Sequence, residues 1–274
     1  MCGIVGILGT KPVALDIVEA LRRLEYRGYD SAGIATIEDG HIERRRAPGK
    51  LRNLEDRLRE APLSGNSGIG HTRWATHGPP CDENSHPHLD QSGKIAVVHN
   101  GVIENYDSLK QRLIKAGHTF HSSTDTEVLA HLIGEHYAKF HAEKSESNPL
   151  TQAVCDALRE VIGTYGVAVI CTEQPDIMVG ARRGSPLIIG IGESENFLTS
   201  DANAIVAHTR QVVFLNDYDV ATLTRDRFDV ISLGSDTAKV QISKLEFQAE
   251  DSQRGEYAHF MLKFNPPKRA VEPS

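Results

Sequence analysis

The stretch Cys2-Gly3-Ile4-Val5-Gly6-Ile7-Leu8 stands one residue from the start of the chain, and the interpretation of the whole sequence begins there. Its apolar residues, interrupted only by glycine, predict a buried strand over residues 3–8. A rigid strand fixes the position of the thiol at its beginning. If Met1 is removed after synthesis, Cys2 holds both a thiol and a free α-amine. The alternative is that Met-Cys is an accident at a buried N-terminus.

The composition limits the classes of protein to which the chain can belong. It has 274 residues, 39% of them hydrophobic, which is enough to bury a full core in one or two domains. The net charge of -7 argues against nucleic acid or an anionic membrane as a partner, because both select for clustered Lys and Arg. No apolar run approaches the roughly 20 residues of a membrane-spanning helix.

Cysteine usage indicates the compartment. The four cysteines show no paired spacing, and the apolar run at the start has neither a basic region before it nor a cleavage site after it. We therefore expect a cytoplasmic protein with reduced thiols. These cysteines are Cys2, Cys81, Cys155 and Cys171.

Outward from the first strand, the pattern alternates between helices and strands. An amphipathic helix is expected from Pro12 to Arg27, where Gly28 can adopt a positive φ, and Asp39-Gly40 predicts a hairpin between strands 31–38 and 41–46. Runs of strands beside a few helices favour an α+β domain with largely antiparallel sheet. Further helices are expected at 51–58, 105–116, 125–139 and 150–162, and further strands at 67–73, 94–99, 165–172, 176–182, 186–191, 196–199, 211–215, 219–224 and 228–232.

One long irregular segment, residues 75–93, is rich in Gly, Pro, Asn and His. A loop of this length inside a compact domain is usually a functional lid or a binding loop. It directly follows His71-Thr72-Arg73-Trp74, which contains the only tryptophan of the chain. The segment is therefore a candidate for closure over a ligand.

Several residues suit acyl-transfer chemistry, and each also has a structural explanation. Near neutral pH roughly a tenth to a fifth of an α-amine is unprotonated and can take the proton of the Cys2 thiol. Asn100-Gly101 suits an oxyanion hole, or equally a hairpin turn. Arg73 suits capture of a carboxylate, or a surface position. Asp125 suits a binding role, or simply the first turn of a helix capped by Thr124.

Two further patterns are weaker. Cys81, His86 and His88 raise the possibility of a metal site, but their spacing matches no standard zinc pattern and a fourth ligand is not evident. We expect no metal and no cofactor. The glycines at 180–192 lack the order strand, Gly-rich loop, helix, so they indicate turns and not a phosphate cradle.

Taken together, seven segments closely resemble the N-terminal glutaminase domain of glutamine–fructose-6-phosphate aminotransferase. The resemblance runs from Cys2 to about Lys263. It implies an N-terminal-nucleophile hydrolase fold, a four-layer αββα arrangement with two antiparallel sheets, and hydrolysis of L-glutamine to glutamate and ammonia through a γ-glutamyl thioester. The segments are CGIVGI (2–7), LRRLEYRGYDSAGIA (21–35), GHTRWATHG (70–78), NSHPH (84–88), VVHNGVIEN (97–105), TDTEVLAHL (124–132) and RRGSPLIIGIG (182–192).

The resemblance also implies a role for each matching residue. The nucleophile is Cys2 with its freed amine as base, and the oxyanion hole is Asn100 with Gly101. For Arg27, which matches an arginine close to the nucleophile, a structural role in its turn is equally open. The other implied roles are binding of the glutamine α-carboxylate by Arg73 and of its α-ammonium by Asp125, closure of the loop over glutamine by Thr76 and His77, a position near that loop for His86, and gating of ammonia by Trp74.

The resemblance ends near Lys263, where the family continues into two sugar-phosphate isomerase domains. We expect a glutaminase domain at 1–263, a disordered tail at 264–274, and no isomerase domains. Fructose 6-phosphate then has no site on this chain, so glutamine should be hydrolysed without amination of the sugar. Full-length members of the family are expected to be homo-oligomers.

Three alternatives remain open at this stage. Amidophosphoribosyltransferase and asparagine synthetase share the Cys2 start, although Trp74 and the RGYDSAGIA segment fit the hexosamine enzyme better. Another N-terminal-nucleophile hydrolase would not need Arg73 and Asp125, which suit a free amino acid. The chain could also bind glutamine without turning it over.

Overall fold

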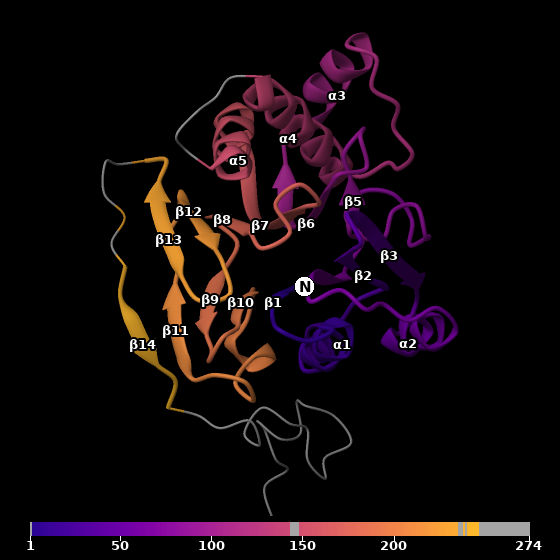
Figure 1. Ribbon diagram of the computed structural model, residues 1–274. Helices are drawn as coiled ribbons and strands as arrows, with labels where there is room; N and C mark the ends of the chain where they lie inside the picture. Colours follow the sequence, from indigo (N-terminus) through magenta and orange to yellow (C-terminus); the bar gives the residue numbers. More distant parts are fainter. Residues whose placement is uncertain (1, 143–147, 235–237, 239, 247–274) are drawn as a thin grey trace, which may run out of the picture.

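The computed structural model describes residues 2–142, 148–234, 238 and 240–246, and it contains two sheets that face each other (Figure 1). In spatial order, the first sheet holds β14 (Ile242–Lys244), β11 (Gln211–Phe214), β9 (Ile188–Ile191), β10 (Asn196–Thr199), β1 (Gly3–Leu8), β4 (Ser67–Arg73), β2 (Ser31–Glu38) and β3 (His41–Pro48). The second holds β13 (Phe228–Ser232), β12 (Asp219–Leu223), β8 (Met178–Arg183), β7 (Gly163–Cys171), β6 (Ile95–Ile103) and β5 (His88–Leu89). Neighbouring strands in both sheets are antiparallel.

Helices cover the outer face of each sheet (Figure 1). On the first sheet lie α1 (Ala14–Arg22) and α2 (Leu51–Glu60), whose apolar residues form one core with β1, β2 and β10. On the second lie α3 (Tyr106–Lys115), α4 (Asp125–Ala142) and α5 (Pro149–Glu160). A third core fills the space between the sheets. The predicted α+β class and the four-layer αββα arrangement are confirmed.

The opening strand is buried on both faces, which explains its unbroken apolar run. Because side chains alternate along a strand, Val5 and Ile7 join the core beneath α1, while Ile4 and Leu8 join the core between the sheets. Strand β1 is central, since it pairs with β10 on one side and β4 on the other. The thiol of Cys2 thus precedes one of the best-held strands of the molecule.

Hydroxyl groups hold the backbone where β1 begins. The Ile4 N–H donates to Ser200 Oγ at 2.9 Å, and the Ile4 carbonyl accepts from Thr199 Oγ1 at 2.9 Å and from the Ser200 N–H at 3.1 Å. Ser200 directly follows β10, so a segment almost 200 residues away in sequence fixes the position of Cys2. Buried backbone groups without such partners would cost about 1–3 kcal/mol each.

The expected elements are present with small shifts at their ends. The helix expected from Pro12 to Arg27 is divided into α1 and a 3₁₀ turn at Glu25–Arg27, and Gly28 follows with φ 76°. The Asp39-Gly40 hairpin joins β2 and β3 as predicted. Three short elements were not anticipated: β5, β14 and a 3₁₀ turn at Ala202–Ala204.

The predicted domain boundary at 263 and the tail at 264–274 lie outside the described residues. Within the described ranges, no helix combines the length and the apolar character needed to cross a membrane.

Candidate active site

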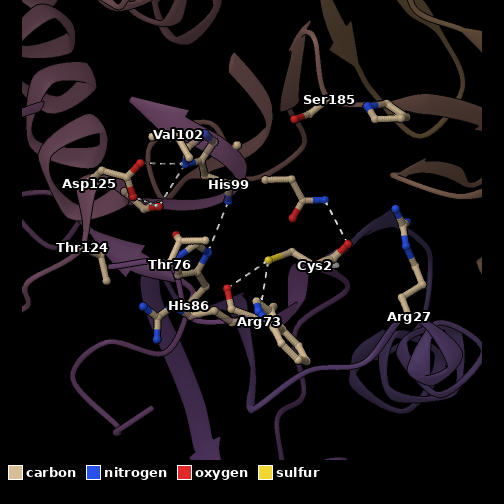
Figure 2. A pocket seen from close by; sticks show the side chains of 15 residues that line it. Cys2, Arg27, Arg73, Thr76, His86, His99, Val102, Thr124, Asp125 and Ser185 are labelled. Carbon is tan, nitrogen blue, oxygen red and sulfur yellow. Dashed lines mark hydrogen bonds and ion pairs between the residues drawn. The ribbon is translucent and has the colours of Figure 1, made fainter. Parts of the chain in front are cut away.

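A cavity of about 270 Å³ lies where the beginning of β1 meets β6 and the start of α4 (Figure 2). It is lined by nine of the ten residues to which the sequence assigned roles at or near the nucleophile, all except His77. The full lining is Cys2, Arg27, Arg73, Trp74, Thr76, His86, His99, Asn100, Gly101, Val102, Thr124, Asp125, Thr126, Ser185 and Pro186.

 Gly101 has no side chain and therefore lines the cavity with its backbone, and His77 lies outside the lining. In Figure 2, Asp125 and Arg27 lie on opposite sides of Cys2.

The thiol of Cys2 contacts the backbone of Trp74. The Trp74 N–H donates to Cys2 Sγ at 3.2 Å, and the thiol can donate to the Trp74 carbonyl at 3.7 Å. Burial raises the pKa of the Cys2 thiol above its usual value, although the Trp74 N–H and the charge of Arg73 oppose the rise. The thiol is therefore protonated near neutral pH, and a nucleophilic role requires a base.

Asn100 and Gly101 lie inside β6, so the interpretation of Asn-Gly as a hairpin turn is wrong. They pair with Gly166 and Tyr165 of β7. The Asn100 Nδ2 donates to the Cys2 carbonyl at 3.4 Å, which places this amide beside the residue that carries the thiol. Gly101 has φ 135°, a conformation open to glycine and strained for other residues. Asn100 and Gly101 thus line the same cavity as Cys2.

Arg73 ends β4 and is only 4% exposed. Its Nη2 donates to the carbonyls of His77 and, at 3.4 Å, of Gly78, so the guanidinium holds the start of the 75–93 loop. Its Nη1 is buried and has no hydrogen-bond partner in the described part of the chain. Among the same residues, no carboxylate forms an ion pair with Arg73. A buried cation without a counterion normally has a ligand to bind.

Asp125 stands in the first turn of α4, as its sequence position predicted. Thr124 caps the helix by accepting the Glu127 N–H at 3.2 Å. The Asp125 Oδ2 accepts the Ile103 N–H at 2.9 Å, and the residue is 4% exposed. The nearest basic group that the described residues offer is His99, whose Nδ1 lies 3.9 Å away. The cavity therefore holds a buried carboxylate without an Arg or Lys partner, together with the unpaired cation of Arg73.

Thr124 and Glu127 have the spacing of a capping box, but only half of it is formed. Thr124 caps the helix, but Glu127 does not reach back to the Thr124 N–H. Its carboxylate instead accepts the His121 N–H at 2.9 Å and the Ser122 N–H at 2.6 Å. This arrangement ties the loop before α4 to the helix and keeps Thr124 and Asp125 in the cavity wall.

The remaining predicted residues surround the cavity in different ways. Trp74 is 55% exposed, and Thr76 is exposed while lining the cavity. The ring of His77 packs edge-on against Tyr106, with the centroids 5.1 Å apart, and its Nδ1 lies 3.3 Å from Thr76 Oγ1. The 75–93 segment thus supplies Thr76 to the cavity wall but turns the His77 ring toward α3.

Arg27 and His86 lie at two other edges of the cavity. Arg27 donates to Ser200 Oγ at 3.5 Å and lies 3.8 Å from the Asp201 carboxylate, so it joins the turn after α1 to the segment after β10. His86 is buried, its Nδ1 accepts the His99 N–H at 3.4 Å, and burial holds its pKa well below the usual value. His86 is therefore neutral at physiological pH.

The structure adds residues to which the sequence assigned no role in the site. His71 contacts Asn100 from outside the lining, and the others line the cavity. His71 stands inside the quoted GHTRWATHG segment, so its neighbourhood could have drawn attention to it. Ser185 and Pro186 stand inside the RRGSPLIIGIG segment in the same way, although their place in the cavity depends on how β8 and β9 are joined. The added lining residues are His99, Val102, Thr124, Thr126, Ser185 and Pro186.

No group of three or more His, Cys, Asp and Glu side chains within the described ranges is arranged to hold a metal ion. The rings of His86 and His88 are buried and pack edge-on at 4.9 Å between centroids.

Comparison with known proteins identifies similar sequences. Residues 58–144 match the model of a glutamine amidotransferase domain family. The chain is 47% identical over 263 residues to the glutamine–fructose-6-phosphate aminotransferase of Clostridium tetani, covering 96% of this chain and 42% of the relative. It is 45% identical over 271 residues to the enzyme of the same name from Aquifex aeolicus, covering 98% and 44%.

Solved structures support the fold. Glutamine phosphoribosylpyrophosphate amidotransferase from B. subtilis superimposes with a TM-score of 0.70 at 24% identity, covering 86% of this chain and 50% of that one. A structure described as the allosteric regulatory enzyme of purine biosynthesis also gives 0.70, at 26% identity, covering 85% and 49%.

The chain has the N-terminal-nucleophile fold, and its residues 58–144 match a glutamine amidotransferase domain. It is similar to part of the glutamine–fructose-6-phosphate aminotransferases, and it spans about 42% of the length of the Clostridium relative.

Proposed function

We propose that the chain hydrolyses L-glutamine to L-glutamate and ammonia through a γ-glutamyl thioester on Cys2. The observation that carries the proposal is the pair of unmatched charges in the cavity that Cys2 also lines. Arg73 Nη1 is buried without a partner, and the buried Asp125 carboxylate has no Arg or Lys partner among the described residues. A free amino acid carries the complementary carboxylate and ammonium groups. Hydrogen bonds between oppositely charged groups are stronger than those between neutral groups.

The proposed mechanism is acyl transfer. After removal of Met1, the α-amine of Cys2 takes the thiol proton, and the thiolate attacks the side-chain amide of glutamine. The Asn100 Nδ2 and the Gly101 N–H stabilise the oxyanion that develops. The protonated amine passes its proton to the departing ammonia, and water then hydrolyses the thioester. The raised pKa of the buried thiol supports the need for this base.

The other predicted residues are proposed to enclose and support the substrate. Thr76 and His77 belong to the loop that closes over glutamine, and His86 supports that loop from the cavity wall. Trp74, exposed beside the nucleophile, gates the passage of ammonia. Arg27 stabilises the segment that follows β10 next to Cys2.

The names of the relatives extend the proposal to a larger reaction. The relatives are named as glutamine–fructose-6-phosphate aminotransferases, and this chain matches 42% to 44% of their length. We propose that the ammonia serves the synthesis of glucosamine 6-phosphate, with fructose 6-phosphate bound by isomerase domains of a longer, homo-oligomeric protein.

Labelling with the glutamine analogue diazo-oxo-norleucine tests the proposal directly. The native chain should release glutamate and ammonia in equal amounts, and the analogue should modify Cys2 and stop the release. Glutamine should protect Cys2 from labelling. Peptide mass spectrometry with a coupled glutamate assay measures both. Protection by glutamine without any release of ammonia would instead indicate a glutamine-binding protein that is not an enzyme.

Neutralising either charge should weaken glutamine binding. Arg73→Gln and Asp125→Asn are each expected to raise KM for glutamine by about 10- to 100-fold, because a hydrogen bond to a charged group contributes about 1.5–3 kcal/mol. Asparagine can still accept the Ile103 N–H, so Asp125→Asn preserves the local fold. Steady-state kinetics provides the measurement. Asp176→Asn, at an exposed position outside the cavity, is the control and should leave KM unchanged.

A further inference from the structure

A buried histidine contacts the side chain that the proposed function places in the oxyanion hole. His71 lies on β4 with no exposed surface, and its Nε2 is 2.9 Å from Asn100 Oδ1. Its ring stacks on that of His86, with centroids 4.2 Å apart and an interplanar angle of 26°. The contact joins the first sheet, which carries His71, to the second, which carries Asn100.

We propose that His71 is a positioning residue that fixes the direction of the Asn100 amide, and this inference rests on the proposed function. With the amide oxygen of Asn100 facing His71, Nε2 of His71 carries the proton, because an amide oxygen can only accept a hydrogen bond. The amide oxygen is then held toward His71, and Nδ2 is held toward Cys2, where it donates to the Cys2 carbonyl. The reverse orientation would turn an oxygen toward the developing oxyanion.

The surroundings of His71 favour one protonation state. Burial lowers the pKa of His71 to about 3, so the ring is neutral near pH 7 and carries a single N–H. Its Nδ1 is buried and makes no hydrogen bond of acceptable geometry in the described part of the chain. An unpaired acceptor is tolerated there more easily than an unpaired N–H donor.

A competing arrangement exists and can be tested. The backbone of His99 lies close enough to raise the pKa of His71. If Nδ1 carried the proton and donated to this backbone, Nε2 would accept from the Asn100 nitrogen and the amide would be reversed. Nitrogen NMR of the native chain with labelled histidine separates the two tautomers. We expect the Nε2–H tautomer; the Nδ1–H tautomer overturns the inference whether or not any variant folds.

Substitution tests the consequence for catalysis. His71→Phe keeps a ring against His86 but removes the donor, and kcat should fall about 10-fold or more while KM changes little, since a site loses activity when its geometry is no longer fixed. His71→Gln offers an N–H at a similar reach and should restore most of kcat. The inference is overturned if His71→Phe keeps the native kcat, or if His71→Gln has a kcat as low as that of His71→Phe.

A second readout excludes general damage to the site. Alkylation of Cys2 by iodoacetamide is a displacement at carbon that forms no oxyanion, so its rate should be the same in His71→Phe and the native chain. Peptide mass spectrometry follows Cys2 separately from the half-buried Cys81. In an Asn100→Ala background, His71→Phe should cause no further loss of kcat. If His71→Phe lowers kcat in that background by the same factor as in the native chain, the positioning role is overturned.

Alkylation of Cys2 also separates the proposed function from the inference about His71. If alkylation of Cys2 in the native chain leaves glutamine hydrolysis intact, the proposed function fails and the inference fails with it. If alkylation stops hydrolysis but His71→Phe retains the native kcat, only the inference about His71 fails.

Discussion

Cys2→Ala is expected to lower glutamine hydrolysis by about 10⁴-fold or more, because removal of a nucleophile leaves only binding and the oxyanion hole to assist the reaction. The fold should be unaffected, since the thiol makes only sulfur contacts with the Trp74 backbone and the strand behind it is held by Ser200 and Thr199. The measurement is the rate of glutamate release, with thermal unfolding to check stability. Residual activity near the native rate would contradict the thioester mechanism.

The matched control is another free thiol. Cys81 is also half-buried, but it does not line the cavity. Cys81→Ala should therefore leave kcat and KM unchanged. If both alanine variants lost activity to the same degree, the loss would have to come from something other than nucleophilic attack by Cys2.

The proposed hydrolysis of glutamine also depends on the free α-amine of Cys2. A chain that retains Met1 has an amide nitrogen at Cys2, which cannot take a proton, so it should be inactive despite an intact thiol. Intact-mass spectrometry of the purified chain gives the fraction that has lost Met1, and kcat should scale with that fraction. Full activity in a chain shown to keep Met1 would require a different base.

The local patterns of the sequence were sufficient for most elements of the fold. Helical periodicity and apolar runs are local properties, and the Asp39-Gly40 turn joins its two strands as expected. Strands β5 and β14 are only two and three residues long, too short for a periodicity to be visible. The pairing of β1 with β10 joins residues almost 200 positions apart, and here only the family resemblance indicated the topology.

For the site, the sequence indicated which residue types were available but not how they were paired. Arg73 could be a surface residue until the structure placed it in the cavity wall, with its Nη1 buried and without a partner among the described residues. The two explanations of Asn100-Gly101 were equal in the sequence, because a glycine after asparagine fits a turn as well as an oxyanion hole. The length of β6, which continues to Ile103, separates them. His71 was missed because a histidine inside a strand gives no local signal of its partner on another sheet.

Gly101→Ala is expected to lower kcat by about 10²–10³-fold, the usual cost of losing one oxyanion-hole donor. At φ 135°, an alanine is strained, and its Cβ would lie 2.1 Å from the Thr164 carbonyl oxygen of β7. Backbone atoms cannot move aside as a flexible side chain can, so β6 must shift and carry the Gly101 N–H away from the cavity. Arg73 lies on the opposite sheet and Asp125 on a helix, so KM should change less than kcat.

Loss of activity in this variant must be distinguished from simple destabilisation, and Gly93 offers the control. It also has a positive φ, of 73°, but no heavy atom of the described residues would lie within 4 Å of a Cβ there. Gly93→Ala should therefore cost about 1–2 kcal/mol in the free energy of unfolding, the usual penalty of a left-handed conformation, and leave kcat unchanged. Chemical denaturation and steady-state kinetics on both variants give the comparison. If Gly101→Ala keeps the native kcat while unfolding more easily, Gly101 is needed for the stability of the sheet and not for the oxyanion hole. If kcat falls at a denaturant concentration well below the unfolding transition of the variant, Gly101 is needed for the reaction.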